Sequence, residues 1–242
     1  MLSMAYQSHR WVIYGFISVN ILMYSLSVIF SLLFATGHVH WQYILSPSNQ
    51  VLLALGASGT IPIDKYHFWW SLVCANYLHS GILHLLVNMF AFNFIARIAL
   101  DMYGISCFVI IYCIGGCCGF ALSYLANVQF TLGASSAICA IIGAVFHVAV
   151  QFKNERQQLF REVIEWIVSI AVIGMIIPKI NNWAHGGGLL TGIFLGFLLR
   201  HSPNQDENRF YQLTAWGCII TIISLLFLSI FIGIECIQSA SS

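Results

Sequence analysis

Residues 184 to 200 read Ala-His-Gly-Gly-Gly-Leu-Leu-Thr-Gly-Ile-Phe-Leu-Gly-Phe-Leu-Leu-Arg, an apolar stretch with a small residue at every fourth position. Ala184, Gly188, Gly192 and Gly196 share one face of a helix, because residues four apart lie above one another. Membrane helices approach closely where small residues repeat at this spacing. This stretch therefore predicts a membrane helix that packs tightly against a second helix.

The segment 135 to 151 carries the matching stripe. Ser136, Ala140 and Ala144 are again four apart, in a run without charged residues. Packing the two stripes face to face would bring the N-terminal ends of the two helices, here called their mouths, within reach of one another. We therefore expect 135 to 151 and 184 to 200 to be neighbours, although they lie 50 residues apart in sequence.

The composition indicates that the surroundings are lipid. Of 242 residues, 60% are hydrophobic and only 7% are charged, and the mean hydropathy is +0.87. A bilayer core of ~30 Å needs about 20 apolar residues per helix, and the alternating pattern of a membrane barrel is absent. We predict an all-α polytopic membrane protein with seven spans, at 11 to 35, 73 to 96, 104 to 126, 135 to 151, 162 to 178, 184 to 200 and 212 to 234.

The domain organisation is a single bundle with one long connection. Residues 1 to 10 form a short cytoplasmic N-terminus, 11 to 200 the core, and 201 to 242 an inner loop, the last span and a short tail. The connection at about 36 to 72 contains turn residues together with Trp and Tyr, which favour the headgroup layer. A signal peptide at the N-terminus is the alternative, but its uncharged run is longer than the ~7 to 15 residues usual for one.

The basic residues predict the orientation, because short cytoplasmic loops retain Lys and Arg. Two lie on the outer side of the predicted spans, Lys65 and Lys179. The other seven lie on the inner side: Arg10, Arg97, Lys153, Arg156, Arg161, Arg200 and Arg209. The N-terminus is therefore expected in the cytoplasm. The net charge of +1 gives no reason to expect a nucleic-acid partner.

Polar residues gather at one depth of this bundle. Ser135 and His185 each open a span that runs from outside to inside, so both are expected near the outer face. The second predicted span adds His79, His84 and Asn88, of which the last two share a helical face. Polar groups in hydrocarbon are costly unless they are paired or face a wet cavity, so this convergence is a site hypothesis.

The chemistry that fits these residues is nucleophilic catalysis by Ser135 with His185 as base. His84 and Asn88 have donors for a developing oxyanion, and the backbone N–H groups at the start of the fourth span add more. Each residue also has a structural interpretation when taken singly. A serine in a membrane helix usually bonds its own backbone, and a lone His or Asn often joins helices. Ser136 competes with Ser135 as nucleophile, but we interpret it as part of the packing stripe.

The chain resembles the rhomboid family of intramembrane serine proteases from about residue 52 to residue 200. The motifs appear in order: His-x(4)-His-x(3)-Asn at 79 to 88, Gly-x-Ser at 133 to 135, and Ala-His-x-x-Gly-x-x-x-Gly at 184 to 192, after a Leu-Ala-Leu-Gly-Ala stretch within 52 to 57. The resemblance implies a six-helix rhomboid-like bundle, to which this chain adds a C-terminal seventh transmembrane helix. Spans one to six would form that bundle.

The resemblance also implies roles for the residues. Ser135 would be the nucleophile and His185 its general base, acting as a dyad that hydrolyses peptide bonds in membrane-spanning substrates. His84, Asn88 and the Ser135 amide would form the oxyanion hole. His79 would support it, and Gly133 and Gly188 belong to the same motifs. No cofactor or metal is implied.

Three positions depart from the family pattern. Ser136 replaces the usual glycine after the nucleophile, Cys139 stands where an aromatic often stacks on the catalytic histidine, and Trp70-Ser71 replaces Trp-Arg. None removes a catalytic group.

The fifth span and the loop from Lys179 to Trp183 are expected to form the gate and cap through which a substrate enters.

Two other function classes remain open. One is a catalytically inactive relative that binds membrane helices, and the intact polar set argues against it. The other is a small transporter or metal carrier that uses His79, His84 and His185, although no acidic residue or thiolate completes a convincing metal site. The eight cysteines contain no Cys-x-x-Cys pair and are interpreted as small buried hydrophobes. A bacterial inner membrane is the expected location, with the site open to the outer face, and a eukaryotic secretory membrane is the alternative that satisfies the same hydropathy.

Overall fold

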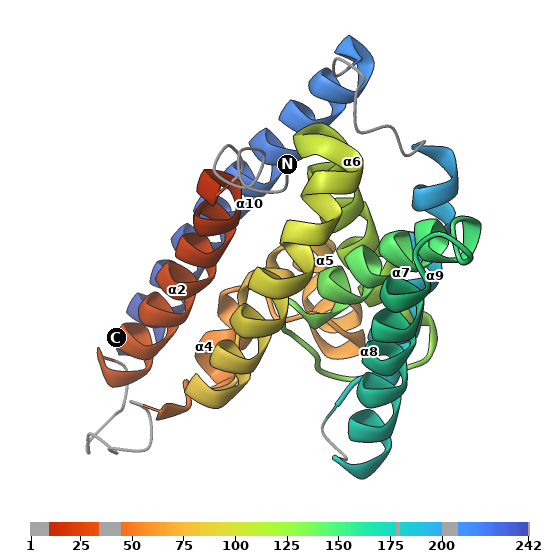
Figure 1. Ribbon diagram of the computed structural model, residues 1–242. Helices are drawn as coiled ribbons and strands as arrows, with labels where there is room; N and C mark the ends of the chain where they lie inside the picture. The colour runs from red at the N-terminus through yellow and green to blue at the C-terminus, as the bar shows by residue number, and fades with distance from the viewer. Residues whose placement is uncertain (1–9, 34–44, 178–179, 200–207, 242) are drawn as a thin grey trace.

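The computed structural model describes residues 10–33, 45–177, 180–199 and 208–241. These residues are helical apart from turns and one isolated β-bridge between Ser58 and Thr131. The α-helices are α2 (Arg10–Leu33), α4 (Asn49–Ala54), α5 (Ser71–Cys74), α6 (Ile82–Leu125), α7 (Ser135–Gln151), α8 (Gln157–Ile176), α9 (Asn182–Leu198) and α10 (Arg209–Ser241). A short π-helix, η1 (Ile61–Lys65), and a 3₁₀ turn, η2 (Ala75–Tyr77), complete the set (Figure 1).

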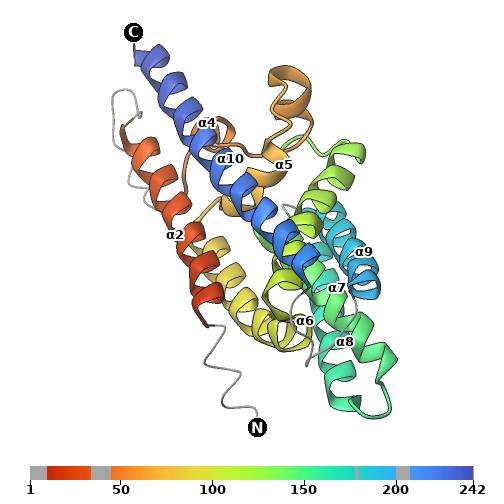
Figure 2. The ribbon, with the colours of Figure 1, turned by 90° about the horizontal axis from the view of Figure 1, so that it is seen from above.

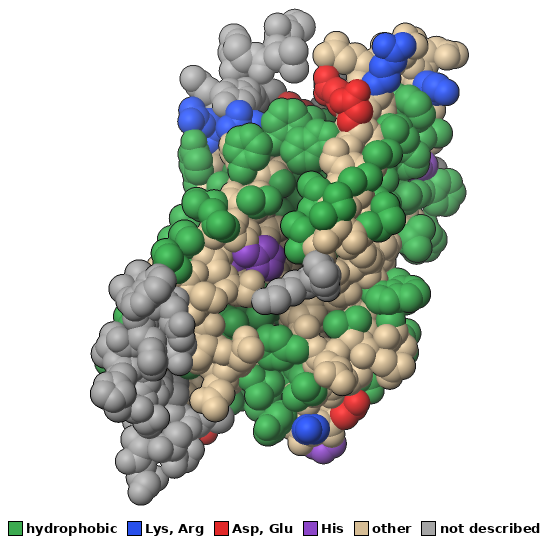
Figure 3. All heavy atoms as spheres, turned by 90° about the horizontal axis from the view of Figure 1, so that it is seen from below, with side chains coloured by type: hydrophobic (Ala, Val, Ile, Leu, Met, Phe, Trp, Pro, Cys, Tyr) green, Lys and Arg blue, Asp and Glu red, His purple; other side chains and the backbone are tan. Residues whose placement is uncertain are grey.

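Three of these helices, α2, α6 and α10, are long and apolar enough to cross a membrane, and α7 is apolar but shorter. Figure 3 shows a face on which the charged side chains lie toward the two ends, with hydrophobic side chains, backbone and a histidine between them. This distribution fits a lipid-facing belt, because charged groups are expelled from hydrocarbon. The expectation of an all-helical membrane protein is confirmed, whereas the count of seven crossings stays a prediction.

The predicted second and third spans are the two halves of α6, which meet at a kink. Helix α6 runs from Ile82 to Leu125 and departs from helical geometry at Gly104, where φ is +72°. Its two halves, 82–103 and 105–125, are each long enough to cross a bilayer at 1.5 Å per residue. The change of direction needs a left-handed backbone conformation that glycine adopts without strain.

The predicted start of the second span at residue 73 is wrong. The chain from 71 to 77 instead forms α5 and η2, and Leu78 is extended before α6 begins at Ile82. Asn76 stabilises this break, because its Nδ2 donates to the carbonyls of Leu72 and Val73 at 3.1 and 3.3 Å. A side chain that bonds nearby carbonyls competes with regular helix. As a result, His79 precedes the helix that carries His84 and Asn88.

The connection after α2 is more ordered than the turn residues predict. Between 45 and 77 it contains α4, η1, α5 and η2, and Ser48 caps α4 by accepting from the Val51 N–H at 3.3 Å. Residues 34–44 of this connection lie outside the described residues.

Helices α7 and α9 form the centre of the molecule and pack backbone to backbone. A Cβ placed on Gly188 would meet the main chain of Ser136, one on Gly192 that of Ala140, and one on Gly196 that of Ala144. The two predicted stripes therefore face each other in register. The second half of α6 joins them, since a Cβ on Gly187 would lie 2.9 Å from Gly119 Cα.

The other helices surround this centre. Helix α8 buries only Val163 and Gly174 among its twenty residues. Helix α10 crosses the opposite side beside α2 (Figure 2). Its Ser229 donates to the Leu55 carbonyl at 2.9 Å, and a Cβ on Gly233 would touch Leu55 and Phe30.

Candidate active site

Ser135 and His185 lie at the first turns of α7 and α9, and their side chains meet. Nε2 of His185 is 2.8 Å from Oγ of Ser135. With the ring proton on Nδ1, the serine hydroxyl donates to Nε2, as a nucleophile donates to a general base. Nδ1 itself is buried and has no hydrogen-bond partner among the described residues. The structure thus brings these two predicted residues together, and within the described part of the chain no third side chain bonds the histidine.

The turn before Ser135 depends on Gly133. Its φ is +127°, a conformation rare for residues with a side chain, and a Cβ there would lie 2.8 Å from His84 Nε2. Its N–H donates to the Ala75 carbonyl at 2.8 Å, which ties the turn to η2. Ala134 then begins α7 without a side-chain cap. The first N–H groups of α7 are therefore free of side-chain caps beside the serine.

His84 faces this turn from α6. Its Nδ1 lies 3.1 Å from Ser80 Oγ. If that hydroxyl donates, Nε2 carries the ring proton, and Nε2 is the nitrogen that faces Gly133. Asn88, one turn further along, is buried and its Nδ2 donates to the His84 carbonyl at 2.9 Å.

His79 lies behind His84. The two rings are 5.0 Å apart and meet edge to face, at 69°. His79 is fully buried, and neither ring nitrogen has a hydrogen-bond partner among the residues the structure describes. It therefore contacts the candidate site through the His84 ring and does not reach it directly.

Ser136 points away from the Ser135 hydroxyl into the junction of three helices. Its Oγ lies 3.1 Å from the Gly116 carbonyl and 3.2 Å from the Ala184 carbonyl, so its single proton is shared between α6 and α9. Gly119 leaves the space for this side chain. The interpretation of Ser136 as a packing residue fits this placement, which also joins α7 to the residue before His185.

Two asparagines that sequence reasoning missed hold the start of α9. Asn181 accepts from the Ala184 N–H at 3.1 Å and donates to Ser123 and Thr131, so it caps the helix and ties it to α6 and the following loop. Asn182 donates to the Gly174 carbonyl of α8 at 2.9 Å. The available signal was an Asn directly before an apolar helix, the usual N-cap arrangement.

The other two departures from the family pattern also have structural consequences. Cys139 is buried between α7 and α9, where a Cβ on Gly188 would lie 3.4 Å from its Cβ. A thiol offers no aromatic face, so the orientation of His185 depends on Ser135 and on the capped start of α9. Ser71, in place of arginine, donates to Ser58 Oγ at 3.2 Å, beside the bridge to Thr131.

Comparison with known proteins identifies the family. Residues 66–202, more than half of the chain, match the model of the Rhomboid domain. The chain belongs to the rhomboid family. Together with the three long apolar helices, this makes it a multi-pass integral membrane protein.

Named rhomboids show moderate similarity. RHOMBOID-like protein 6, mitochondrial, of Arabidopsis thaliana is 31% identical over 177 residues, covering 72% of this chain and 57% of that protein. RHOMBOID-like protein 4 of the same plant is 28% identical over 207 residues, covering 75% and 52%. Rhomboid protease GluP of Bacillus subtilis is 32% identical over 153 residues, covering 62% and 29%. This rhomboid spans about half the length of the plant relatives it matches.

Proposed function

We propose that this rhomboid is an intramembrane serine endopeptidase that cleaves membrane-spanning segments of other proteins. The observation that carries the proposal is the 2.8 Å contact between His185 Nε2 and Ser135 Oγ. A hydroxyl and an imidazole within hydrogen-bond reach at the mouths of two packed helices are arranged for acyl transfer.

In the proposed reaction, His185 takes the proton of Ser135 as Oγ attacks the scissile carbonyl carbon. The imidazolium then gives this proton to the leaving amine, which departs as the C–N bond breaks. A water, deprotonated by His185, hydrolyses the acyl-enzyme and restores both side chains. Because Nδ1 of His185 meets no described acceptor, the imidazolium is expected to gain no stabilisation from a carboxylate.

The negative oxygen of the tetrahedral intermediate would lie between the start of α7 and His84. Donors proposed for it are the Ser135 N–H, the Nε2–H of His84 and the second amide proton of Asn88, whose first proton bonds the His84 carbonyl. Loss of one such donor is expected to lower kcat by about 10²-fold to 10³-fold. Gly133 keeps this space open, since a side chain there would fill it.

Helix α8 is the proposed route for a substrate. It buries two of its residues and is tied to α9 by the Asn182 to Gly174 hydrogen bond. A helix with so little buried surface is among the elements that separate most readily. The cap proposed at Lys179 to Trp183 is described only from residue 180 onward.

The proposed location is a bacterial inner membrane with the N-terminus in the cytoplasm and the site open to the outer face. This follows from the seven basic residues on one side of the predicted spans and two on the other. The proposed partners are the substrate's transmembrane segment and the bilayer.

The test is cleavage of a model single-span substrate by purified protein in lipid, with fluorophosphonate labelling of the serine in parallel. Ser135→Ala and His185→Ala should abolish cleavage, and labelling should be lost in Ser135→Ala but retained in Ser136→Ala. The failure of folded wild-type protein to cleave or label would favour the inactive helix binder instead.

A further inference from the structure

Ser80 is an exposed serine that no step of the proposed reaction uses. It directly precedes Gly81, the N-cap of α6. Its Oγ lies 3.1 Å from Nδ1 of His84, while Nε2 of the same ring faces Gly133 at the candidate site. A neutral imidazole carries one proton, and the hydrogen bond at one nitrogen decides which nitrogen holds it. Ser80 therefore acts on the His84 ring from the side opposite the site.

The contact between Ser80 and His84 has two arrangements, which differ in the position of the ring proton. When the serine hydroxyl donates, Nδ1 accepts and Nε2–H faces Gly133. When Nδ1–H donates to Oγ, Nε2 presents a lone pair to the same space, which disfavours a developing negative oxygen. Only the first arrangement allows His84 to donate to the tetrahedral intermediate.

The backbone of Ser80 is held by residues 45–48, the segment before α4, here called the strap. Ser46 Oγ donates to the Ser80 carbonyl at 2.7 Å. The strap also packs closely against the N-cap of α6, since a Cβ on Gly81 would lie 3.0 Å from the Leu45 carbonyl oxygen. The position of Ser80 is therefore set by a segment that precedes it by more than thirty residues.

The strap is in turn fixed to α2. The Tyr24 hydroxyl donates to the Leu45 carbonyl at 3.1 Å, and the Ser48 N–H donates to Ser31 Oγ at 2.9 Å. Tyr24 and Ser31 are buried, where a broken bond would leave a polar group unpaired. Successive contacts thus lead from α2 through the strap and Ser80 to His84.

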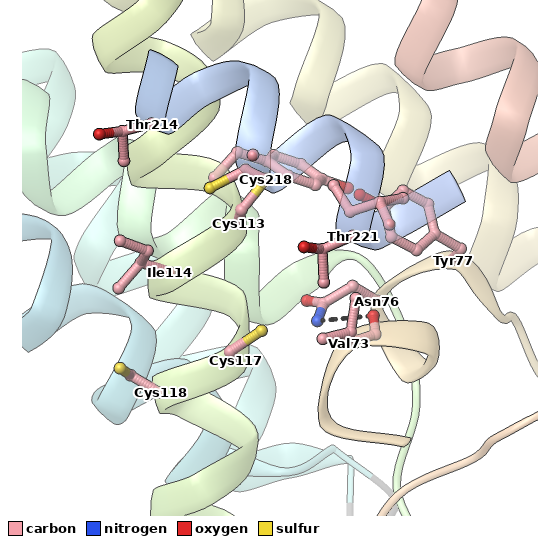
Figure 4. Close-up of a pocket in the computed structure, with 13 residues that line it drawn as sticks. Val73, Asn76, Tyr77, Cys113, Ile114, Cys117, Cys118, Thr214, Cys218 and Thr221 are labelled. Carbon is pink, nitrogen blue, oxygen red and sulfur yellow. Dashed lines mark hydrogen bonds between the residues drawn. The ribbon is translucent and has the colours of Figure 1, made fainter. Parts of the chain in front are cut away.

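Within the described part of the chain, the Ser80 hydroxyl is the one hydrogen-bond partner of the His84 ring. A cavity of about 480 Å³ lies between η2, the second half of α6 and α10, and neither Ser80 nor His84 lines it (Figure 4). A molecule in that cavity would not contact Nδ1. The proton of the His84 ring is therefore under the control of Ser80.

We propose that Ser80 is a positioning residue that keeps the ring proton of His84 on Nε2, and that the strap holds Ser80 in place for this role. The proposal rests on the proposed peptidase activity, because the oxyanion is the group that the Nε2 proton meets. The position of the proton itself can be measured without any cleavage.

The first experiment records imidazole ¹⁵N–¹H correlation spectra of the full chain in nanodiscs, with all histidines ¹⁵N-labelled. These spectra show which ring nitrogen carries the proton, and His84→Gln identifies the His84 signals by their loss. In wild type the proton is expected on Nε2. In Ser80→Ala the ratio of the Nε2–H to the Nδ1–H form should fall by roughly twofold to tenfold, the range for one neutral hydrogen bond. A wild-type ring with its proton on Nδ1 would overturn the proposal, and this result depends on no variant.

The second experiment measures cleavage of a single-span substrate. In Ser80→Ala, kcat should fall in proportion to the Nε2–H population while KM stays unchanged, because the interaction exists only in the transition state. Ser80→Thr keeps the hydroxyl and should retain the wild-type tautomer and kcat. Ser46→Ala should shift both in the same direction as Ser80→Ala. The control is Ser25→Ala, since Ser25 is also exposed but donates to the Ile21 carbonyl of its own helix, and it should change neither.

The two readouts separate this proposal from the proposed function. A loss of kcat in Ser80→Ala without a change of tautomer would make Ser80 merely structural and overturn the proposal. Cleavage by a wild-type protein with the proton on Nδ1 would overturn it and leave the peptidase standing. An Nε2 proton that is lost in Ser80→Ala, in a protein that cleaves nothing, would refute the peptidase and support the control of His84 by Ser80.

Discussion

The close packing of α7 against α9 predicts that one methyl group at Gly192 destabilises the protein. A Cβ there would lie 2.6 Å from the carbonyl carbon of Ala140 and 2.7 Å from its Cα, and closer still to its carbonyl oxygen. Ordinary carbon contacts are ~3.5 to 4.0 Å, so the two backbones must separate by about 1 Å. Overpacking of this kind costs about 1 to 3 kcal/mol.

Gly186→Ala is the control. Gly186 lies on the same helix, and a Cβ there would meet nothing within 4 Å. Both changes replace glycine by alanine in α9, so the ~1 kcal/mol gain in helix propensity is common to both. Gly192→Ala should therefore be less stable than Gly186→Ala by about 1 to 3 kcal/mol.

The measurement is reversible unfolding of each variant in mixed micelles with increasing SDS. Fluorophosphonate labelling provides a second readout, because a 1 Å separation extended to the helix mouths would take the 2.8 Å contact of His185 and Ser135 beyond hydrogen-bond range. Equal free energies of unfolding for the two variants would refute the backbone packing of α7 and α9.

Three further changes test the surroundings of the site. Gly133→Ala forces a left-handed φ on alanine and places its Cβ against His84, so serine labelling should fall by tenfold or more in folded protein; unchanged labelling would exclude this turn geometry. Asn181→Ala removes a helix cap and two donated hydrogen bonds, so it should lower the free energy of unfolding by about 2 to 4 kcal/mol in the same assay. Asn181→Asp keeps the cap acceptor and should lower it less. A larger loss of stability for Asn181→Asp than for Asn181→Ala would contradict the capping role. Asn182→Ala frees α8 from α9 at Gly174 and should raise amide hydrogen exchange in the last turns of α8 with little change in α7; equal exchange in wild type and variant would argue against this tie.

The sequence predicts the packing of α7 and α9 well, because small residues at a spacing of four specify both the contact face and the register. Gly188, Gly192 and Gly196 meet Ser136, Ala140 and Ala144 as the pattern predicts. The meeting of Ser135 and His185 follows from that register, since each residue begins its helix.

The segment from 71 to 81 could not be predicted from hydropathy. Its residues are apolar enough to continue a span, and the break depends on Asn76 bonding two carbonyls of its own chain. The tie of Ser136 to two helices also escaped prediction, because it requires the space at Gly119 in a third helix. Hydropathy measures the preference for lipid and contains no information about where individual hydrogen bonds form.

The lengths of the two central helices determine the depth of the candidate site. Helices α7 and α9 each contain 17 residues, or ~25 Å at 1.5 Å per residue, whereas a typical hydrocarbon core is ~30 Å thick. If their far ends are level with one interface, the mouths that carry Ser135 and His185 stop roughly 5 Å short of the other, unless the bilayer thins around them. Hydrophobic mismatch then decides whether a peptide bond meets the serine below the headgroups or at a locally thinned membrane surface, so the thickness of the host membrane becomes a determinant of where a substrate is cut.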